Sequence, residues 1–285
     1  MISIVVITHK RIFSLKALLD ALNAETEEFE IVLINNSSSK EEEELLKYYD
    51  NIRYLSMGAN IDLSQARNLG MNASEGDIIA FTDDDCIPKN GWLNVIKENI
   101  GDYDAIGGPV LSYLALKYPW WWDDEYSWLI GLSPPAMNYE EEGIVHIPQT
   151  ANIALKRKVA QKVQFREALG KPRLPLREDT LFWKDIRSKG FKVRIIPEMI
   201  VYHRIPQERL YFHACIKRSF NDGLLQGYFR EEDLKKIIKF GLISFIEIFV
   251  EMLRIRPKFV AAHILQTMRS MGFLYGILLY KSRNV

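Results

Sequence analysis

The sequence predicts an α/β fold built on a doubly wound, mostly parallel sheet with helices on both faces. Three apolar runs rich in Val and Ile occur at 2–8, 29–35 and 77–83, and helical patterns separate them. A run that is apolar throughout is typical of a strand buried on both faces of a parallel sheet. Strands alternating with helices favour this architecture, in which ligands bind outside the carboxyl ends of the strands.

The first helix is expected within residues 11–25, where apolar side chains recur at helical spacing. They are Phe13, Leu15, Leu18, Leu19 and Leu22. Segment 37–50 starts with serines followed by an acidic run, which predicts a serine-capped helix with a favourable first turn. A shorter apolar run at 52–57 predicts a fourth strand, and 64–76 predicts a helix that stops at Gly76.

The second half of the chain is less regular. Residues 147–163 predict a loop or strand leading into a helix, and 177–190 predict a helix stopped by Gly190. Segment 191–204 predicts two short strands interrupted by Pro197. Four of the six tryptophans lie within 118–129, namely Trp120, Trp121, Trp122 and Trp128. They are suited to stacking on sugars or to a membrane interface, with plain core packing the less favoured alternative.

The charge is balanced overall but divided along the chain. With 37 basic and 37 acidic residues, nothing in the net charge argues for a nucleic acid partner. From Arg204 onward there are 14 basic and 7 acidic residues, whereas the first 203 residues hold 23 and 30. We therefore expect a domain over 1–204 and a separate basic region over 205–285 with a partner of its own, such as an anionic membrane surface.

The C-terminal region contains a long apolar segment at 235–256 between basic ends. Its polar residues form one narrow stripe, comprising Ser244, Glu247, Glu251 and Arg254. The two glutamates argue against a bilayer span, so the segment predicts an interfacial helix. A weaker version of the pattern follows at 259–280. The two cysteines, Cys86 and Cys215, show neither disulfide nor metal-site spacing and are expected to be free thiols.

Three consecutive carboxylates, Asp83, Asp84 and Asp85, end the third apolar run. In extended backbone the first and third side chains share one side, where they repel each other unless a cation lies between them. Mg²⁺ or Mn²⁺ suits such oxygen ligands, particularly together with substrate phosphates. A solvated acidic turn explains the tripeptide equally well, so the tripeptide by itself leaves both interpretations open.

A longer set of segments resembles a known family. "SIVVITHKR", "IVLINNSS", "LSQARNLGMNASEGDIIAFTDDDCIP", "EDTLFW" and "VYHR" are similar to family 2 inverting glycosyltransferases with the GT-A fold, over about residues 2–204. The resemblance implies metal-dependent transfer of a sugar from a nucleotide donor. Asp85 would ligate Mn²⁺ or Mg²⁺ through the diphosphate, and Asp83 would face the ribose and the outer shell of the metal. Asp84 belongs to the same donor-binding element but is expected to have a structural role.

The resemblance also assigns the nucleotide pocket. Thr8 and His9 would lie in it, and Arg67 would approach the uracil and phosphates, the alternative for Arg67 being a helix-surface salt bridge. Where the family usually has an Asp that contacts the base, this chain has Asn35 and Asn36. An amide both donates and accepts hydrogen bonds, so base contact survives and a UDP-sugar is the expected donor, but the base stays open.

Further roles follow from the resemblance on the acceptor side. Asp179, with Glu178 beside it, would be the general base that deprotonates the acceptor hydroxyl, the alternative being an acidic pair at a helix start. His203 would be a metal ligand, the alternative being an ordinary hydrogen-bonded histidine. Asn152 would lie on the sugar and acceptor side.

The C-terminal segments around 218–229 and 268–280 look like those of bacterial and archaeal polysaccharide glycosyltransferases. This resemblance implies a cytoplasmic enzyme held peripherally at the inner face of the cell membrane, with a saccharide or lipid-linked saccharide acceptor. Two alternatives remain. A nucleotidyltransferase would share the metal–diphosphate site but usually has a Gly-rich loop after the first strand, and "THKRIFSL" has none. An inactive carbohydrate-binding or membrane-scaffold protein would not need Asp179.

Overall fold

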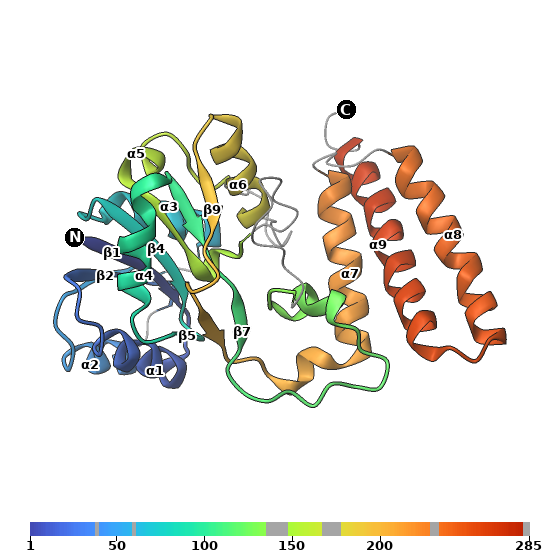
Figure 1. Cartoon of the computed structure of the whole chain (residues 1–285), viewed down its shortest axis with the longest axis horizontal. Helices are drawn as coiled ribbons and strands as arrows, with labels where there is room; N and C mark the ends of the chain where they lie inside the picture. The colour runs from blue at the N-terminus through green and yellow to red at the C-terminus, as the bar shows by residue number, and fades with distance from the viewer. Residues whose placement is uncertain (38–39, 59–60, 135–147, 167–177, 229–233, 282–285) are drawn as a thin grey trace. The chain divides into compact units, whose positions relative to one another are not determined.

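Seven strands form the main sheet in the computed structural model, which describes all residues except 38–39, 59–60, 135–147, 167–177, 229–233 and 282–285 (Figure 1). The strands are β1 (Ile2–Thr8), β2 (Phe29–Asn35), β3 (Ile52–Ser56), β4 (Ile78–Asp83), β6 (Ala105–Gly107), β8 (Ile153–Lys156) and β9 (Val193–Ile195). Their order is β3-β2-β1-β4-β8-β6-β9. The pairs within β3-β2-β1-β4 and the pair β6–β9 are parallel, and β8 is antiparallel to both of its neighbours. The predicted mostly parallel sheet is confirmed.

Helices cover both faces of this sheet. They are α1 (Ile12–Leu22), α2 (Lys40–Leu46), α3 (Leu63–Ala73), α4 (Trp92–Asn99), α5 (Arg157–Ala160) and α6 (Glu178–Ser188). Successive strand residues point to opposite faces, and Ile4, Val5 and Val6 of β1 are all fully buried, so neither face is open to water. On one face the core continues into α3 and α6, where Phe182 and Trp183 pack with the sheet residues.

A second, three-stranded sheet has the order β5-β10-β7, with β5 at Cys86–Pro88, β10 at Val201–His203 and β7 at Val110–Ser112. The two strands predicted around Pro197 exist as β9 and β10, but they belong to different sheets. The predicted stop of α6 at Gly190 is confirmed, since Gly190 has φ +79°, a backbone conformation that favours glycine.

Two details of the predicted helices are wrong. Phe13, expected on the buried side of α1, is 87% exposed, whereas the four leucines of that pattern are buried. Helix α3 ends at Ala73, three residues before the predicted stop at Gly76. Gly76 instead allows a close approach, because a Cβ there would collide with the backbone of Met1 and Ser3. The serine cap predicted for α2 includes Ser38 and Ser39, which lie outside the described residues.

The chain divides into two compact units. The described residues within Met1–Leu114, Ala136–Gly170 and Glu178–Arg204 form the sheet unit, and those within Ala115–Pro135 and Ile205–Val285 form the helical unit. Short 3₁₀ helices occur in both: η1 (Ile100–Asp102) and η3 (Thr150–Asn152) in the first, η2 (Asp124–Ile130) and η4 (Gln207–Leu210) in the second. Each unit is described below by itself.

The helical unit contains three long helices that lie side by side: α7 (Phe212–Tyr228), α8 (Leu234–Leu253) and α9 (Pro257–Lys281) (Figure 1). Glycines set the spacing between α7 and α9. Gly223 and Gly227 face Arg269 and Phe273 so closely that a Cβ on either glycine would overlap a carbonyl oxygen. Gly272 and Gly276 make the reciprocal approach from α9. Such pairs of small residues four apart let two helix backbones approach closely.

The tryptophan segment belongs to this helical unit, and core packing explains half of it. Trp121 and Trp122 are buried, and the ring of Trp121 meets that of Phe212 at 4.9 Å. Trp120 is 67% exposed, and Trp128 lies under the guanidinium of Arg269 at 5.7 Å. Core packing, the less favoured alternative for the tryptophans, therefore describes Trp121 and Trp122.

Helix α8 has its polar stripe on the inside. Ser244 and Glu251 are buried, whereas apolar residues such as Phe245, Ile246 and Phe249 are more than half exposed. A Cβ on Gly241 would meet the side chain of Ser270 on α9, so the narrow polar side faces α9. Within the described part of the chain, no helix combines the length and apolarity needed to cross a bilayer.

Candidate active site

The candidate site lies where β1 and β4 end. The two strands are parallel neighbours, with Ile7 paired to Asp83, so that Thr8 and the carboxylates after β4 emerge at the same edge of the sheet. Asn35 ends β2 opposite Thr8 and adds a third polar residue to this edge. Ligand sites of open α/β sheets lie at the carboxyl ends of the strands.

Asp84 is held inside the protein by Thr8 and Arg11. The hydroxyl of Thr8 donates to Oδ2 of Asp84 at 3.0 Å, and Nη1 of Arg11 donates to Oδ1 at 3.0 Å. Burial raises the pKa of Asp84 to about 6, and the positive charge of Arg11 opposes the rise. With 4% exposure and both oxygens used by the protein, Asp84 fits the structural role expected for it.

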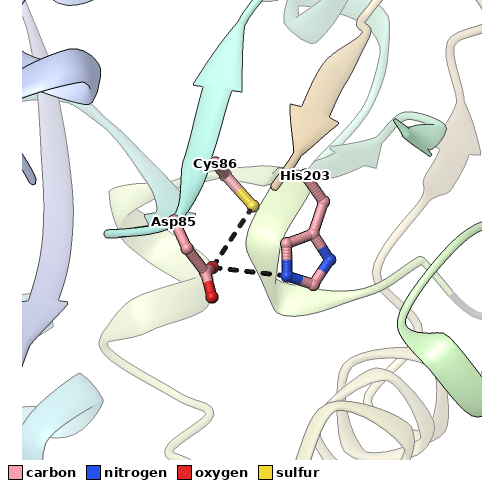
Figure 2. A group of neighbouring side chains, drawn as sticks. All are labelled: Asp85, Cys86 and His203. Atoms are coloured by element: carbon pink, nitrogen blue, oxygen red, sulfur yellow. Dashed lines mark hydrogen bonds and ion pairs between the residues drawn. The ribbon is translucent and has the colours of Figure 1, made fainter. Parts of the chain in front are cut away.

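Asp85 joins three elements of the sheet unit. Nη1 of Arg11 also donates to its Oδ2 at 2.7 Å, and Nε2 of His203 lies 3.4 Å from its Oδ1 (Figure 2). The pairing of β5 with β10 places His203 directly opposite Cys86, the residue after Asp85. The backbone N–H of Arg204 donates to the carbonyl of Asp85 at 2.9 Å, which fixes the end of β10 beside the acidic turn.

Asp85, Cys86 and His203 form a cluster that can hold a metal ion, since their ligand atoms all lie within 4.8 Å of one another. Burial raises the pKa of the Cys86 thiol and the neighbouring carboxylates add to the rise. A sulfur ligand is soft and suits Zn²⁺ or Cu⁺ better than the hard cations Mg²⁺ and Mn²⁺. The carboxylate suits Mg²⁺ or Mn²⁺, and imidazole favours a transition metal. The donor set that remains, one carboxylate oxygen and one imidazole nitrogen, fits Mn²⁺ completed by phosphate oxygens.

Asp83 points to a different partner. Nη2 of Arg67 lies 3.7 Å from its Oδ1, and the Arg67 guanidinium stacks over the ring of Phe165 at 5.4 Å. Desolvation raises the pKa of Asp83, Arg67 opposes the rise, and Asp85 adds to it. Arg67 is only 3% exposed, so the helix-surface salt bridge considered for it is wrong. The buried guanidinium of Arg67 and the partly exposed carboxylate of Asp83 thus form an ion pair at the edge of the acidic turn.

The two asparagines are committed to the protein itself. The Asn35 amide donates to Oε2 of Glu42 at 2.7 Å and to the Tyr54 hydroxyl at 2.8 Å. Its carbonyl accepts from the N–H and hydroxyl of Ser37. Asn36 makes two 2.8 Å bonds with the backbone of Ile61. Asn35 is fully buried and its amide is paired within the protein, so its contact with the base stays a prediction.

His9 and Asn152 differ in their access to a ligand. His9 is exposed, and its Nδ1 lies 2.9 Å from the carbonyl of Asn36, so it remains at the rim of the site. Asn152 is fully buried; its amide donates to the carbonyls of Pro109 and Met199, and its Oδ1 accepts from the Trp92 indole at 2.9 Å. All of these hydrogen bonds are internal to the protein, and the sugar contact expected of Asn152 stays a prediction.

Asp179 lies in the first turn of α6, as the sequence predicted for an acidic helix start. Its Oδ1 accepts from the N–H of Thr180 at 2.7 Å, and among the described residues its hydrogen bonds use this oxygen alone. Glu178 is the first residue of α6, and its side chain lies outside the described part of the structure.

Three residues of the site escaped sequence reasoning. Arg11 bridges Asp84 and Asp85. In the sequence it is simply one of two adjacent cations in "HKR" after the first strand, and nothing there distinguishes it from Lys10. Glu42 is fully buried and accepts from the N–H of Arg11 and the Asn35 amide, and its Oε1 lies 3.4 Å from the Thr8 hydroxyl oxygen, although its run of glutamates resembles a solvated helix face. Cys86 joins the cluster only because β10 pairs with β5.

A mostly parallel sheet with an acidic turn after β4, and with a histidine brought to that turn by a second small sheet, defines an α/β protein of the GT-A fold class. The chain belongs to glycosyl transferase family 2, because that family's sequence model matches residues 3–164.

Two curated relatives agree with this assignment. The chain is 28% identical over 170 residues to the succinoglycan biosynthesis protein ExoM of Rhizobium meliloti (strain 1021), a match that covers 58% of this chain and 52% of the relative. It is 25% identical over 171 residues to a glucosyl-dolichyl phosphate glucuronosyltransferase of Haloferax volcanii, covering 58% and 54%. The matches thus span about half the length of these relatives.

Solved structures show the same fold. The S. aureus TarS 1-349 structure in complex with UDP-GlcNAc aligns with a TM-score of 0.55 at 14% identity, covering 99% of this chain and 92% of that one. The same protein in complex with UDP aligns with a TM-score of 0.51 at 15% identity, covering 99% and 91%. At this identity the likeness concerns the fold alone. The predictions of the family and of its fold are confirmed.

Proposed function

We propose that this protein is a metal-dependent inverting glycosyltransferase that moves a sugar from a nucleoside-diphosphate donor to a saccharide or lipid-linked saccharide. The observation that carries the proposal is the meeting of Asp85 and His203, 3.4 Å apart at the carboxyl edge of the sheet. Family membership supports the reaction class, and the donor set supports Mn²⁺.

Asp85 and His203 would hold the metal. A bound divalent cation neutralises the charge that develops on a leaving diphosphate. Arg11 is directed at the same carboxylate and keeps the acidic turn compensated when no divalent cation is bound. Asp83 and Arg67 offer an acceptor and a donor side by side, which suits a ribose hydroxyl and a phosphate oxygen respectively.

Asp179 would accept the proton of the acceptor hydroxyl as the acceptor oxygen attacks C1 of the sugar. The bond between C1 and the diphosphate oxygen breaks, and the nucleoside diphosphate leaves with the electron pair. Direct displacement of this kind needs one base near the attacking oxygen and inverts the configuration at C1. The N–H of Thr180 holds the carboxylate of Asp179 in place.

The comparisons support the substrate classes. TarS was solved with UDP-GlcNAc and with UDP, so a UDP-sugar is the donor to test first. The name of one relative includes a glucosyl-dolichyl phosphate and that of another succinoglycan biosynthesis, which supports a lipid-linked or free saccharide acceptor.

The exposed face of α8 supports peripheral attachment at the inner face of the cell membrane. Phe240, Phe245, Ile246 and Phe249 are all between 46% and 59% exposed, and Lys235, Lys236 and Lys239 at the start of the helix are exposed as well. Contiguous exposed apolar residues mark interaction surfaces, and nearby lysines favour anionic lipid.

The double variant Phe245→Ser/Phe249→Ser should lose cosedimentation with vesicles containing 30% phosphatidylserine, whereas Phe13→Ser, an exposed phenylalanine of the sheet unit, should retain it.

The reaction is tested with a panel of nucleotide-sugars, each incubated with Mn²⁺, Mg²⁺ or EDTA, with free nucleoside diphosphate as the readout. We expect release with Mn²⁺ and none with EDTA. Asp85→Asn should abolish it, whereas Asp77→Asn, an exposed carboxylate at the other end of β4, should not. Asp179→Asn should bind donor and fail to turn over.

Other outcomes identify the alternatives. Release of pyrophosphate from a nucleoside triphosphate incubated with a sugar 1-phosphate, with no nucleoside diphosphate released from the nucleotide-sugars, would identify a nucleotidyltransferase. Donor binding with no turnover by the wild type, across a panel of saccharide acceptors, would identify an inactive carbohydrate-binding or scaffold protein of the same fold.

A further inference from the structure

The helical unit contains an apolar cavity of about 570 Å³. Nine of its ten lining residues are apolar and are contributed by the tryptophan segment, the start of α7, the end of α8 and the start of α9. Small-molecule sites have volumes of about 300–1,000 Å³ and are mostly apolar with a few placed polar groups. The cavity therefore has the size and lining of a site for a hydrocarbon ligand.

Among the described residues that line the cavity, Arg256 alone is charged, and it lies in the turn between α8 and α9. Its Nε lies 3.3 Å from Oε2 of the buried Glu251, to which Arg254 also bonds at 2.9 Å. Lys258, in the first turn of α9, is exposed. Two arginines pair with one carboxylate here and a lysine follows in the sequence, so an excess of positive charge lies beside the apolar cavity. An amphiphile with an anionic head complements both features.

Apolar side chains are exposed at this turn and elsewhere on the rim of the cavity. Ile255 lines the cavity, is 86% exposed, and has φ +54°, a conformation that a β-branched residue rarely adopts. Met252 on the same rim is 59% exposed, and Trp120 is 67% exposed. Exposed apolar side chains around an apolar cavity are expected where a hydrocarbon chain enters from a lipid phase.

We infer that this cavity binds the isoprenoid chain of a polyprenyl-phosphate-linked acceptor, with Arg256 at the phosphate. The inference rests on the proposed function and gives its acceptor a binding site in the helical unit. An isoprenoid has fewer rotatable bonds than a saturated chain of equal length and loses less entropy when it is ordered. Trp120 and Trp121 present rigid aromatic faces to it.

The test uses the full-length protein and tryptophan fluorescence, because two tryptophans line the cavity. Farnesyl phosphate, below its micelle concentration, should give a saturable change. Farnesol and dodecyl phosphate should bind at least threefold more weakly, and inorganic phosphate should give no change. Equal or tighter binding of dodecyl phosphate, or no saturable change with farnesyl phosphate, overturns the inference.

Paired variants locate the site. Val260→Phe narrows the cavity and should raise the Kd for farnesyl phosphate at least tenfold, whereas Met271→Phe, an exposed position of α9 that does not line the cavity, should change it less than twofold. Arg256→Gln should raise the Kd at least tenfold and Arg254→Gln less than threefold, because both bond Glu251 but only Arg256 lines the cavity. Equal effects within either pair overturn the assignment.

Three further measurements test the remaining alternatives. Trp120→Ala, at an exposed position whose loss costs little packing, should also weaken binding and stands in for Val260→Phe if that variant does not fold. A dimer in light scattering that Val260→Phe dissociates, without farnesyl phosphate binding, assigns the cavity to a second copy and overturns the inference. UDP binding with Mn²⁺, measured on the same wild-type samples, tests the proposed function separately: its failure alongside intact farnesyl phosphate binding refutes the donor site and leaves the lipid site standing.

Discussion

Replacing Arg11 by glutamine removes the one guanidinium that bridges Asp84 and Asp85, at 3.0 and 2.7 Å. The two carboxylates are 5% and 12% exposed, so their charges lose their compensation inside the protein. Hydrogen bonds to charged groups are worth about 1.5–3 kcal/mol each, and the 49% exposure of the Arg11 side chain reduces this through solvent screening. We expect the free energy of unfolding to fall by about 2 kcal/mol without metal.

Thermal denaturation followed by circular dichroism measures this loss, because about 2 kcal/mol lowers the midpoint of a domain of this size by about 4–8 °C. Saturating Mn²⁺ with UDP should reduce the difference between Arg11→Gln and wild type to less than about 1 kcal/mol, since the cation then compensates Asp85. Lys16→Gln is the matched control: it breaks an exposed pair with Asp20 and should not move the midpoint measurably.

Two results would refute this reasoning. If Arg11→Gln is as stable as wild type without metal, the ion pairs contribute nothing and the acidic turn is compensated in another way. If its deficit is unchanged by Mn²⁺ with UDP, although both proteins bind the nucleotide, the metal does not lie at Asp85.

Four further outcomes are expected. Asn152→Ala should lower the free energy of unfolding by about 2–3 kcal/mol in urea denaturation, because it leaves buried donors and acceptors unpaired. Gly227→Ala should cost about 1–3 kcal/mol by forcing α7 from α9, and a wild-type urea midpoint would contradict that packing. Ile255→Asn should raise the free energy of unfolding by about 1 kcal/mol, seen as a higher thermal midpoint, because asparagine tolerates a positive φ better than isoleucine. Burial raises the pKa of the Cys86 and Cys215 thiols, the latter to about 11, so both should resist a disulfide reagent at pH 8 until urea unfolds the chain.

The strands predicted best are the largely buried ones. β1 and β2 have the predicted bounds and β4 differs by one residue, because a continuous apolar run rich in Val and Ile favours a strand covered on both faces. β3 also differs by one residue, although it is only partly buried. The three-residue strands β5, β6 and β7 carry too few side chains for a period to appear in the sequence. Their positions depend on pairing with strands that are distant in the sequence.

The orientation of helix α8 likewise could not be predicted from the sequence. The sequence displays its narrow polar stripe at Ser244, Glu247, Glu251 and Arg254, but the direction in which that stripe points is not a local property. In the folded unit Ser244 and Glu251 are buried and the phenylalanines face outward. The close approach at Gly241 and the bonds of Glu251 to two arginines decide the orientation, and both involve residues on other turns or on α9.

The sequence by itself determined the alternating α/β architecture and the acidic turn at the end of a buried strand, because both follow from the polarity of near neighbours in the chain. Only the tertiary structure decided what the three aspartates do. Asp84 is buried with Thr8 and Arg11, Asp83 is directed at Arg67, and Asp85 meets His203. The physical reason is that each of these partners arrives through strand pairing or side-chain packing between segments distant in sequence, and such pairing leaves no periodic signal in the chain.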